Sequence, residues 1–137
     1  MCAFSNLIET LQVLQDRSLR LGIITNGYGT FQMDNIKALG IEQYFETILV
    51  SEWERMKKPH PNIFPKALTQ LGVAADESIY VGDHPVNDVK GSMNTGMGGV
   101  WKKDVHWEKV LADHIITDLH ELIDLVDSLN MEKRRGV

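Results

Sequence analysis

Several absences limit what this 137-residue sequence can be. It contains one cysteine, Cys2, so it forms no internal disulfide, and so little cysteine is typical of a reducing compartment. No apolar run approaches the length of a membrane span, and the amino-terminal segment lacks the basic and then apolar pattern of a secretion signal. These absences predict a cytoplasmic protein with no membrane partner.

The sequence also has few basic residues. Its 14 Lys and Arg against 19 Asp and Glu give a formal charge of −5, and the basic residues form no continuous stripe. Proteins that bind nucleic acid usually carry a basic patch, so we expect no nucleic-acid partner. There is no internal repeat, low-complexity segment or linker, and the length fits one domain. With 43% apolar residues, the chain can bury a substantial core.

Helix-like and strand-like segments alternate along the chain, with a polar loop expected over 52–61. This alternation predicts an α/β fold in which helices cover a mostly parallel sheet of four or five strands. Apolar residues recur at helical spacing in residues 4–14, 31–39, 62–71, 87–95 and 119–129. Short apolar runs typical of buried strands occupy 19–25, 47–51, 78–82 and 99–102, with a fifth, short one at 114–117.

The third of these strands carries the most informative motif. Its apolar residues end in Gly82-Asp83, and a second carboxylate, Asp88, follows on the first turn of the next helix. Open α/β sheets bind ligands at the carboxyl ends of their strands. Two carboxylates at this edge are suited to Mg²⁺, which binds oxygen ligands and the phosphates of substrates. Because many parallel strands end in Gly-Asp, a purely structural role for the pair is the alternative.

Polar residues of other kinds follow the first two strands. Thr25-Asn26-Gly27 supplies a hydroxyl, an amide and backbone N–H groups at a helix entrance, and such groups can hold a phosphate. Lys58 precedes Pro59, which favours an extended backbone, and the lysine can reach the same edge as a phosphate-directed cation. Each has a simpler interpretation. The first segment can be a turn selected only for its backbone conformation, and Lys58 can be an ordinary solvated lysine. Their occurrence together with Asp83 favours a phosphate site.

In this order the residues resemble the haloacid dehalogenase superfamily of hydrolases, which are mostly phosphatases, and in particular its capped branch. Residues 23–27 resemble the second motif of the family, and Lys58-Pro59 with Pro61 and Phe64 resembles the third. Residues 82–88 resemble the fourth motif. The resemblance implies a Rossmann-like three-layer sandwich around the parallel sheet.

The resemblance implies a role for each of these residues. Thr25 and Lys58 are implied to be catalytic and, with Asn26-Gly27, to bind the transferring phosphoryl group. Asp83 is implied to be a ligand of Mg²⁺, and Asp88 to belong to the same metal site. The implied activity is the Mg²⁺-dependent hydrolysis of a small phosphorylated metabolite through an aspartyl-phosphate, with the substrate as the main partner.

One motif of the family is missing. The first motif is Asp-x-Asp, whose first Asp is the nucleophile, and the sequence contains no Asp-x-Asp. The resemblance thus implies that residues 1–137 form a single truncated core domain without the cap and without the central first strand. An aspartyl-phosphate needs that carboxylate, so we expect the chain to be inactive alone. We also expect it to bind Mg²⁺ weakly or not at all.

The missing strand has a structural consequence. In the family it lies between the strand ending at Thr25 and the strand ending at Asp83. Its removal exposes two strand edges, whose backbone N–H and C=O groups need partners. Residues 21–25 and 79–82 can pair directly, which is the outcome that we favour. Alternatively, a second copy of the chain can fill the gap as a homodimer.

Other functions fit parts of the sequence. A 2-haloacid dehalogenase is the rival within the superfamily, although that branch lacks the Gly-Asp carboxylate site. A non-catalytic protein-binding or regulatory role agrees with the missing nucleophile. Gly27-Tyr28-Gly29 weakly resembles a nicotinamide-binding loop, but Gln32 stands in place of the third glycine. A signalling receiver domain also uses Asp, Thr and Lys at strand ends, in a different order along the chain.

Overall fold

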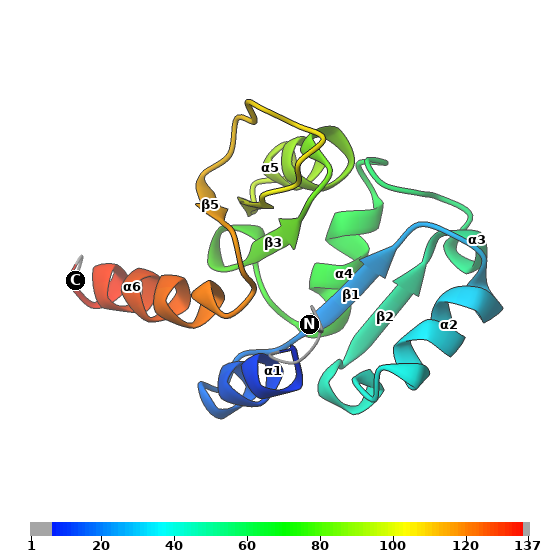
Figure 1. Ribbon diagram of the computed structural model, residues 1–137, viewed down its shortest axis with the longest axis horizontal. Coiled ribbons are helices and arrows are strands. Elements are labelled where there is room, and N and C mark those ends of the chain that lie inside the picture. The colour runs from blue at the N-terminus through cyan, green and yellow to red at the C-terminus, as the bar shows by residue number, and fades with distance from the viewer. Residues whose placement is uncertain (1–6, 136–137) are drawn as a thin grey trace.

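A computed structural model describes residues 7–135, so that Cys2 and the first predicted helical position, Phe4, lie outside the described residues. Helices and strands alternate as the sequence predicts (Figure 1). None of the described helices is both long and apolar enough to cross a membrane. The elements are α1 (Leu7–Asp16), β1 (Gly22–Thr25), α2 (Gly29–Ala38), η1 (Glu42–Tyr44), β2 (Thr47–Val50), α3 (Ser51–Glu54), α4 (Ile63–Leu71), η2 (Ala75–Glu77), β3 (Ile79–Gly82), η3 (Pro85–Lys90), α5 (Gly91–Met93), β4 (Gly98–Lys102), β5 (His114–Ile116) and α6 (Glu121–Arg135).

The five strands of residues 7–135 all pair in parallel, but they form two sheets. In the first sheet β1 pairs with β2, and Thr25 lies beside Val50 at the carboxyl ends. In the second sheet the strand order is β3-β4-β5, and Gly82 lies beside Trp101. The carboxyl ends of β1 and β3 therefore present Thr25 and the Gly82-Asp83 turn, on which the predicted site depends.

Two predicted segments differ in detail from the structure. The expected polar loop contains a short helix, α3, which ends where Arg55 adopts a left-handed backbone with a φ of 58°. The helix predicted at 87–95 consists of the π-helical segment η3 followed by the short α5. His84 caps η3, because its Nδ1 accepts hydrogen bonds from two backbone N–H groups of that segment. This cap fixes the start of the segment that carries Asp88.

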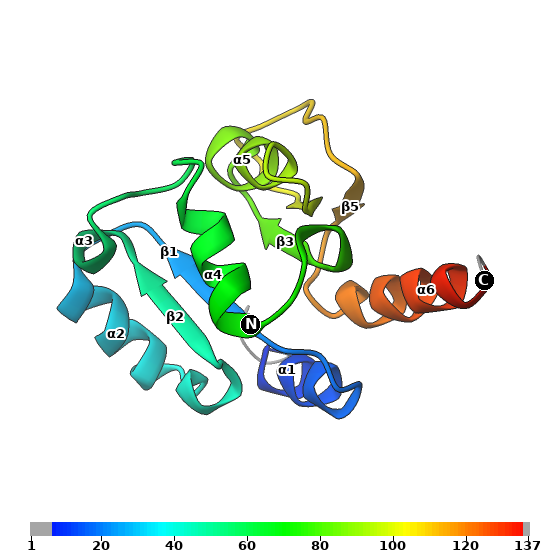
Figure 2. The same cartoon turned by 180° about the vertical axis from the view of Figure 1, so that it is seen from behind.

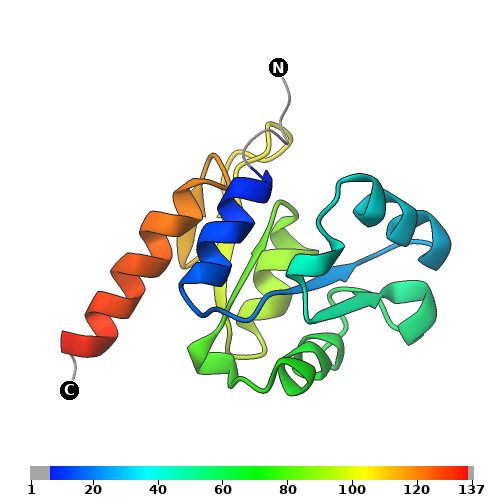
Figure 3. The ribbon, with the colours of Figure 1, turned by 90° about the horizontal axis from the view of Figure 1, so that it is seen from below.

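Helices cover both faces of the sheets, which confirms the three-layer α/β architecture. On one face α1 packs against both sheets, through Leu11 for the first and Leu14 for the second. The helix α6 lies beside α1 (Figure 3). On the other face the fully buried Phe64 of α4 packs with Ile24 of β1 and Tyr80 of β3. The helices α1 and α4 thus each span the two sheets.

Direct pairing of residues 21–25 with 79–82, the outcome favoured from the sequence, is wrong. Within the described chain β1 and β3 share no ladder of backbone hydrogen bonds and belong to separate sheets. The physical reason is side-chain packing, since α1 and α4 each contact both sheets and Tyr80 of β3 reaches β1. Closing by one strand spacing would displace this packed core. Figure 2 shows the molecule from the side that α4 covers, with α4 between β1 and β3.

Candidate functional site

Asn26 ties together two segments of the predicted site. Its side-chain amide donates to the carbonyl of Lys58 at 3.2 Å, and its Oδ1 accepts the backbone N–H of Lys58 at 2.9 Å. This pair of bonds holds the segment between α3 and α4 against the end of β1. The side chain of Asn26 therefore positions the lysine, because both of its polar atoms bond to the Lys58 backbone.

Thr25 and Gly27 also bond to neighbouring groups. The Thr25 hydroxyl donates to Oε1 of Gln32 on α2 at 3.2 Å. The Gly27 N–H donates to the hydroxyl of Ser51 at 2.8 Å, and that hydroxyl reaches the Gly27 carbonyl at 3.3 Å. Gly27 has a φ of 144°, a backbone conformation that other residues rarely adopt. These bonds fix the shape of the turn, and a phosphate would compete with Gln32 for the Thr25 hydroxyl.

Lys58 and Asp88 join the third segment of the site to the first two. Lys58 Nζ donates to Asp88 Oδ1 at 2.6 Å, and the two side chains are only 13% and 7% exposed. The other carboxylate oxygen of Asp88 accepts the backbone N–H of His84 at 3.1 Å. Both oxygens of Asp88 are therefore engaged, and the ion pair lies largely out of water.

The turn after β3 gives its two carboxylates different environments. A Cβ at Gly82 would lie 2.3 Å from the Asp88 carboxylate, so only glycine allows this close approach. Asp88 is buried, whereas Asp83 is exposed. The backbone carbonyl of Asp83 accepts the indole N–H of Trp101 at 3.0 Å, which anchors the end of β3 to β4. Asp83 thus presents an open carboxylate, and Asp88 a paired one.

Tyr80 contacts the same lysine. Lys58 Nζ lies 5.5 Å from the centroid of the Tyr80 ring, within the range of a cation–π interaction. The phenol hydroxyl donates to the carbonyl of Ile24 at 3.1 Å. Burial raises the pKa of Tyr80 well above its usual value, and the charges of Asp88 and Asp83 raise this pKa further. The phenol therefore stays protonated and remains a donor at physiological pH.

The side chains around the turn offer a limited set of ligands for Mg²⁺. Among residues 7–135, no cluster of three or more His, Cys, Asp or Glu side chains is arranged to hold a metal ion. Asp88 already accepts hydrogen bonds at both oxygens, which leaves the exposed carboxylate of Asp83 as the more accessible ligand. Mg²⁺ is often held by one or two carboxylates with waters and substrate phosphates. The residues therefore fit a weak site that a phosphate would complete.

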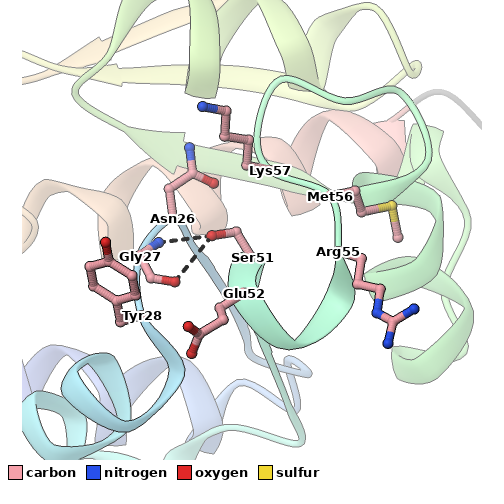
Figure 4. Close-up of a pocket in the computed structure, with 8 residues that line it drawn as sticks. All are labelled: Asn26, Gly27, Tyr28, Ser51, Glu52, Arg55, Met56 and Lys57. Atoms are coloured by element: carbon pink, nitrogen blue, oxygen red, sulfur yellow. Dashed lines mark hydrogen bonds between the residues drawn. The ribbon is translucent and has the colours of Figure 1, made fainter.

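A pocket of about 660 Å³ adjoins the turn at residues 25–27 and lies between the β1–α2 loop and α3 (Figure 4). Glu52 accepts the backbone N–H of Gly29 at 2.7 Å and so holds α3 against the start of α2. Two of the predicted site residues line the pocket, and Lys57 lies near Asn26 at its border with the site. The lining residues are Asn26, Gly27, Tyr28, Ser51, Glu52, Arg55, Met56 and Lys57.

The structure joins most of the predicted residues in one bonded set. The turn at 25–27, Lys58 and Asp88 are linked through the Asn26 and Lys58 contacts. Asp83 is bonded instead through its backbone carbonyl to Trp101. Sequence reasoning missed the residues that support the set. In the sequence, the only feature that marks His84 and Ser51 is their position next to the end of a strand. Nothing in the sequence pattern marks the other two supporting residues, Gln32 and Tyr80.

Known proteins share sequence with this chain. A profile of haloacid dehalogenase-like hydrolases matches residues 1–102. The glyceraldehyde 3-phosphate phosphatase of Pyrococcus furiosus is 37% identical over 129 residues, which cover 89% of this chain and 53% of the relative. The protein of the same name from Methanocaldococcus jannaschii is 33% identical over 134 residues, covering 94% and 58%. The chain spans about half the length of these curated relatives.

Solved structures share its fold. A HAD phosphatase from Thermococcus onnurineus superimposes with a TM-score of 0.83 and 32% identity, covering 89% of this chain and 57% of that protein. A 2-haloacid dehalogenase from Pseudomonas syringae pv. Tomato gives a TM-score of 0.78 and 31% identity, covering 92% and 54%. The same architecture thus occurs in proteins described as phosphatases and as dehalogenases.

Proposed function

The chain belongs to the haloacid dehalogenase-like hydrolases, and from that membership we propose that its site serves the Mg²⁺-dependent hydrolysis of a small phosphomonoester. The observation that carries the proposal is the bonded set around Lys58, which links the strand end of Thr25 to the carboxylate of Asp88. A hydroxyl at the end of β1, a largely buried ammonium and carboxylates after the end of β3 are the kinds of group that phosphoryl transfer uses for positioning and charge stabilisation. The reaction also needs a nucleophilic carboxylate, and the sequence contains no Asp-x-Asp to supply it.

In the proposed reaction an aspartate carboxylate attacks the phosphorus atom, and the bond to the leaving-group oxygen breaks as that oxygen takes up a proton from water, so that an aspartyl-phosphate and an alcohol form. A water molecule then hydrolyses the aspartyl-phosphate to inorganic phosphate and restores the carboxylate. The Thr25 hydroxyl donates to a phosphoryl oxygen in place of Gln32. The Lys58 ammonium offsets the negative charge of the phosphoryl group, and its backbone is held for this task by Asn26. Gly27 contributes to phosphate binding through the shape of the turn that it allows.

Mg²⁺ would offset charge on the phosphoryl oxygens when bound. Asp83 is the residue that we expect to hold it, and Asp88 supports the site through its bonds to Lys58 and His84. One accessible carboxylate makes a poor Mg²⁺ site without a substrate phosphate, so we expect a dissociation constant of about 1 mM or weaker. Calorimetry in the presence and absence of inorganic phosphate measures it, and micromolar affinity without phosphate would contradict this expectation.

The chain by itself should not turn over phosphomonoesters, because the aspartyl-phosphate has no nucleophile. An aryl phosphate and glyceraldehyde 3-phosphate, the compound named in several relatives, are suitable substrates for an assay with Mg²⁺. We expect phosphate release no higher than that of the Asp83→Asn variant. Turnover that Asp83→Asn abolishes would overturn the proposed inactivity and point to a substitute nucleophile.

Complementation tests the phosphatase function itself. The part of the Pyrococcus furiosus phosphatase that this chain does not match can be produced together with the chain. We expect the pair to release phosphate from glyceraldehyde 3-phosphate, and Lys58→Gln in the chain to abolish that activity. Lys37→Gln, at an exposed position on α2, is the matched control and should leave it unchanged. Activity that survives Lys58→Gln would contradict the role of this lysine.

A 2-haloacid dehalogenase is the second candidate, favoured by the similarity to the Pseudomonas syringae enzyme. Chloride release from 2-chloropropionate by the complemented pair, undiminished by EDTA and by Asp83→Asn, would favour it over the phosphatase. A folded complemented pair that shows neither activity would contradict both catalytic functions.

A further inference from the structure

Tyr80 connects the two sheets through its side chain. It belongs to β3, yet its hydroxyl donates to the carbonyl of Ile24 in β1 at 3.1 Å. Its ring packs against Phe64 of α4 in a T-shaped arrangement, with the ring centroids 5.2 Å apart and the planes at 89°. Ile24 directly precedes Thr25 in the sequence. The phenol thus reaches the strand end that carries the hydroxyl of the proposed phosphate site.

The same ring faces the proposed cation of the site. Lys58 Nζ lies 5.5 Å from the Tyr80 centroid and 2.6 Å from Asp88 Oδ1. The ammonium group is therefore held by a carboxylate and an aromatic face together, while Asn26 holds the lysine backbone. Because the ammonium is only slightly exposed, the attraction of the ring is weakly screened by water.

We propose that Tyr80 is a positioning residue that sets the Lys58 ammonium and the Thr25 strand end at a fixed separation. The face of its ring holds the ammonium, and its hydroxyl holds β1 through Ile24. The two sheets share no backbone ladder within the described chain, so this side chain takes over part of the alignment that a ladder would give. The inference rests on the proposed function, since it assumes that Thr25 and Lys58 meet one phosphoryl group.

The two halves of this role can be separated by substitution. Tyr80→Phe keeps the aromatic face and removes only the bond to Ile24. Tyr80→Leu removes the ring as well. Tyr44→Leu is the matched control, because the hydroxyl of Tyr44 is also hydrogen-bonded, but its buried ring packs with Leu11 and Ile36 in a different cluster from that of the partly buried Tyr80. A purely structural loss should therefore be similar in Tyr80→Leu and Tyr44→Leu.

The first measurement is the dissociation constant of inorganic phosphate for the chain, by calorimetry or phosphorus NMR. We expect Tyr80→Leu to weaken phosphate binding about tenfold and Tyr80→Phe by about threefold, in line with the strength of a desolvated cation–π contact and of one hydrogen bond. Tyr44→Leu should leave the constant unchanged. Equal weakening in Tyr80→Leu and Tyr44→Leu would show a general loss of structure and overturn the inference.

The second measurement is a spectroscopic signature that a structural role would not give. Protons above an aromatic face are shifted upfield in NMR spectra by the ring current. The Lys58 Cε protons should show this shift in the wild type and in Tyr80→Phe, and lose it in Tyr80→Leu. Tyr44→Leu should keep it. An unshifted signal in the wild type would overturn the placement of the ammonium over the ring.

The variant Lys58→Gln distinguishes failure of this inference from failure of the proposed function. If Lys58→Gln abolishes phosphate binding while Tyr80→Leu keeps the wild-type constant, the inference on Tyr80 is overturned and the proposed function stands. If the wild type binds phosphate no better than Lys58→Gln, or does not bind it, Lys58 does not contact a phosphoryl group in this chain. That result overturns both proposals.

Discussion

Lys58 and Asp88 form an ion pair whose side chains are 13% and 7% exposed. Removing two charges from water is costly, and their attraction offsets this cost only when the geometry is good and the remaining oxygens are satisfied. Here His84 satisfies the second oxygen of Asp88. At the scale of residues, the site therefore consists of groups that depend on one another, so that losing one partner leaves an uncompensated charge.

A double-mutant cycle on this pair tests the dependence. Lys58→Met leaves the Asp88 carboxylate buried without its cation, and it should lower the free energy of unfolding by about 3 kcal/mol or more. Adding Asp88→Asn should recover more than about 1 kcal/mol, because the amide can still accept the His84 N–H and no unpaired charge remains. Urea unfolding of the four proteins measures the effects. Simple additivity would contradict the coupling.

The raised pKa of Tyr80 predicts a loss of stability at high pH. In the unfolded chain a tyrosine ionises near pH 10, whereas burial keeps Tyr80 protonated in the fold. The folded state therefore holds a proton that the unfolded state loses, and stability declines as the pH rises above about 10, by up to about 1.4 kcal/mol per pH unit. Tyr80→Phe should show a shallower decline, measured by urea unfolding between about pH 9 and about pH 11. If the stability of the wild type and of Tyr80→Phe declined with pH at the same slope, this contribution of Tyr80 would be refuted.

At the scale of elements, α4 holds the two sheets on one face. Its residues Ile63 and Phe64 are fully buried, and Phe64 packs with Ile24 of β1 and Tyr80 of β3. Apolar residues of this helix recur at the spacing that places them on one side, and the glycine Gly72 ends it with a φ of 70°. The helix therefore contributes to the fold through one buried stripe.

Removing the Phe64 ring should test this stripe. Phe64→Ala leaves a cavity where both sheets meet α4, and we expect a loss of about 3–5 kcal/mol in the free energy of unfolding. Phe31→Ala is the matched control, because Phe31 on α2 is 62% exposed, and it should cost less than about 0.5 kcal/mol. Urea unfolding measures the free energy of unfolding of both variants and of the wild type. A small effect of Phe64→Ala would mean that α4 is not needed to hold the sheets.

At the scale of the whole molecule, the sheets leave strand edges facing each other without a backbone ladder between β1 and β3, among the described residues. Open edges tend to recruit other strands. We therefore propose that a second copy of the chain fills this space and that the protein forms a homodimer. The outer edge of the second sheet, β5, is a different surface, on which Ile115 is 50% exposed.

Sedimentation over a range of concentrations tests the dimer. We expect the mass of two chains, and we expect Ile115→Lys to leave this mass unchanged because β5 lies away from the space between the sheets. A monomer at every concentration would contradict the proposal. A dimer that Ile115→Lys dissociates would place the interface at β5 instead.

The order of elements and the chemistry at their ends follow from the amino-acid sequence alone. The apolar runs before Thr25 and Gly82 are strands, and α1, α2 and α4 lie close to their predicted positions, whereas α3 occupies part of the expected loop. This success has a local cause, since burial of alternating or periodic apolar residues depends on spacing along the chain. The residue types at the strand ends, a hydroxyl, a lysine and two carboxylates, are likewise properties of the sequence.

How those ends meet depends on tertiary packing. Direct pairing of β1 with β3 was the outcome expected from the sequence, but the structure keeps these strands apart because α1, α4 and Tyr80 pack across both sheets. The partners of the site residues also come from distant segments, as when Asn26 bonds to Lys58 and Lys58 to Asp88. Such contacts depend on the shapes of many side chains packed together, and no local pattern in the sequence encodes them.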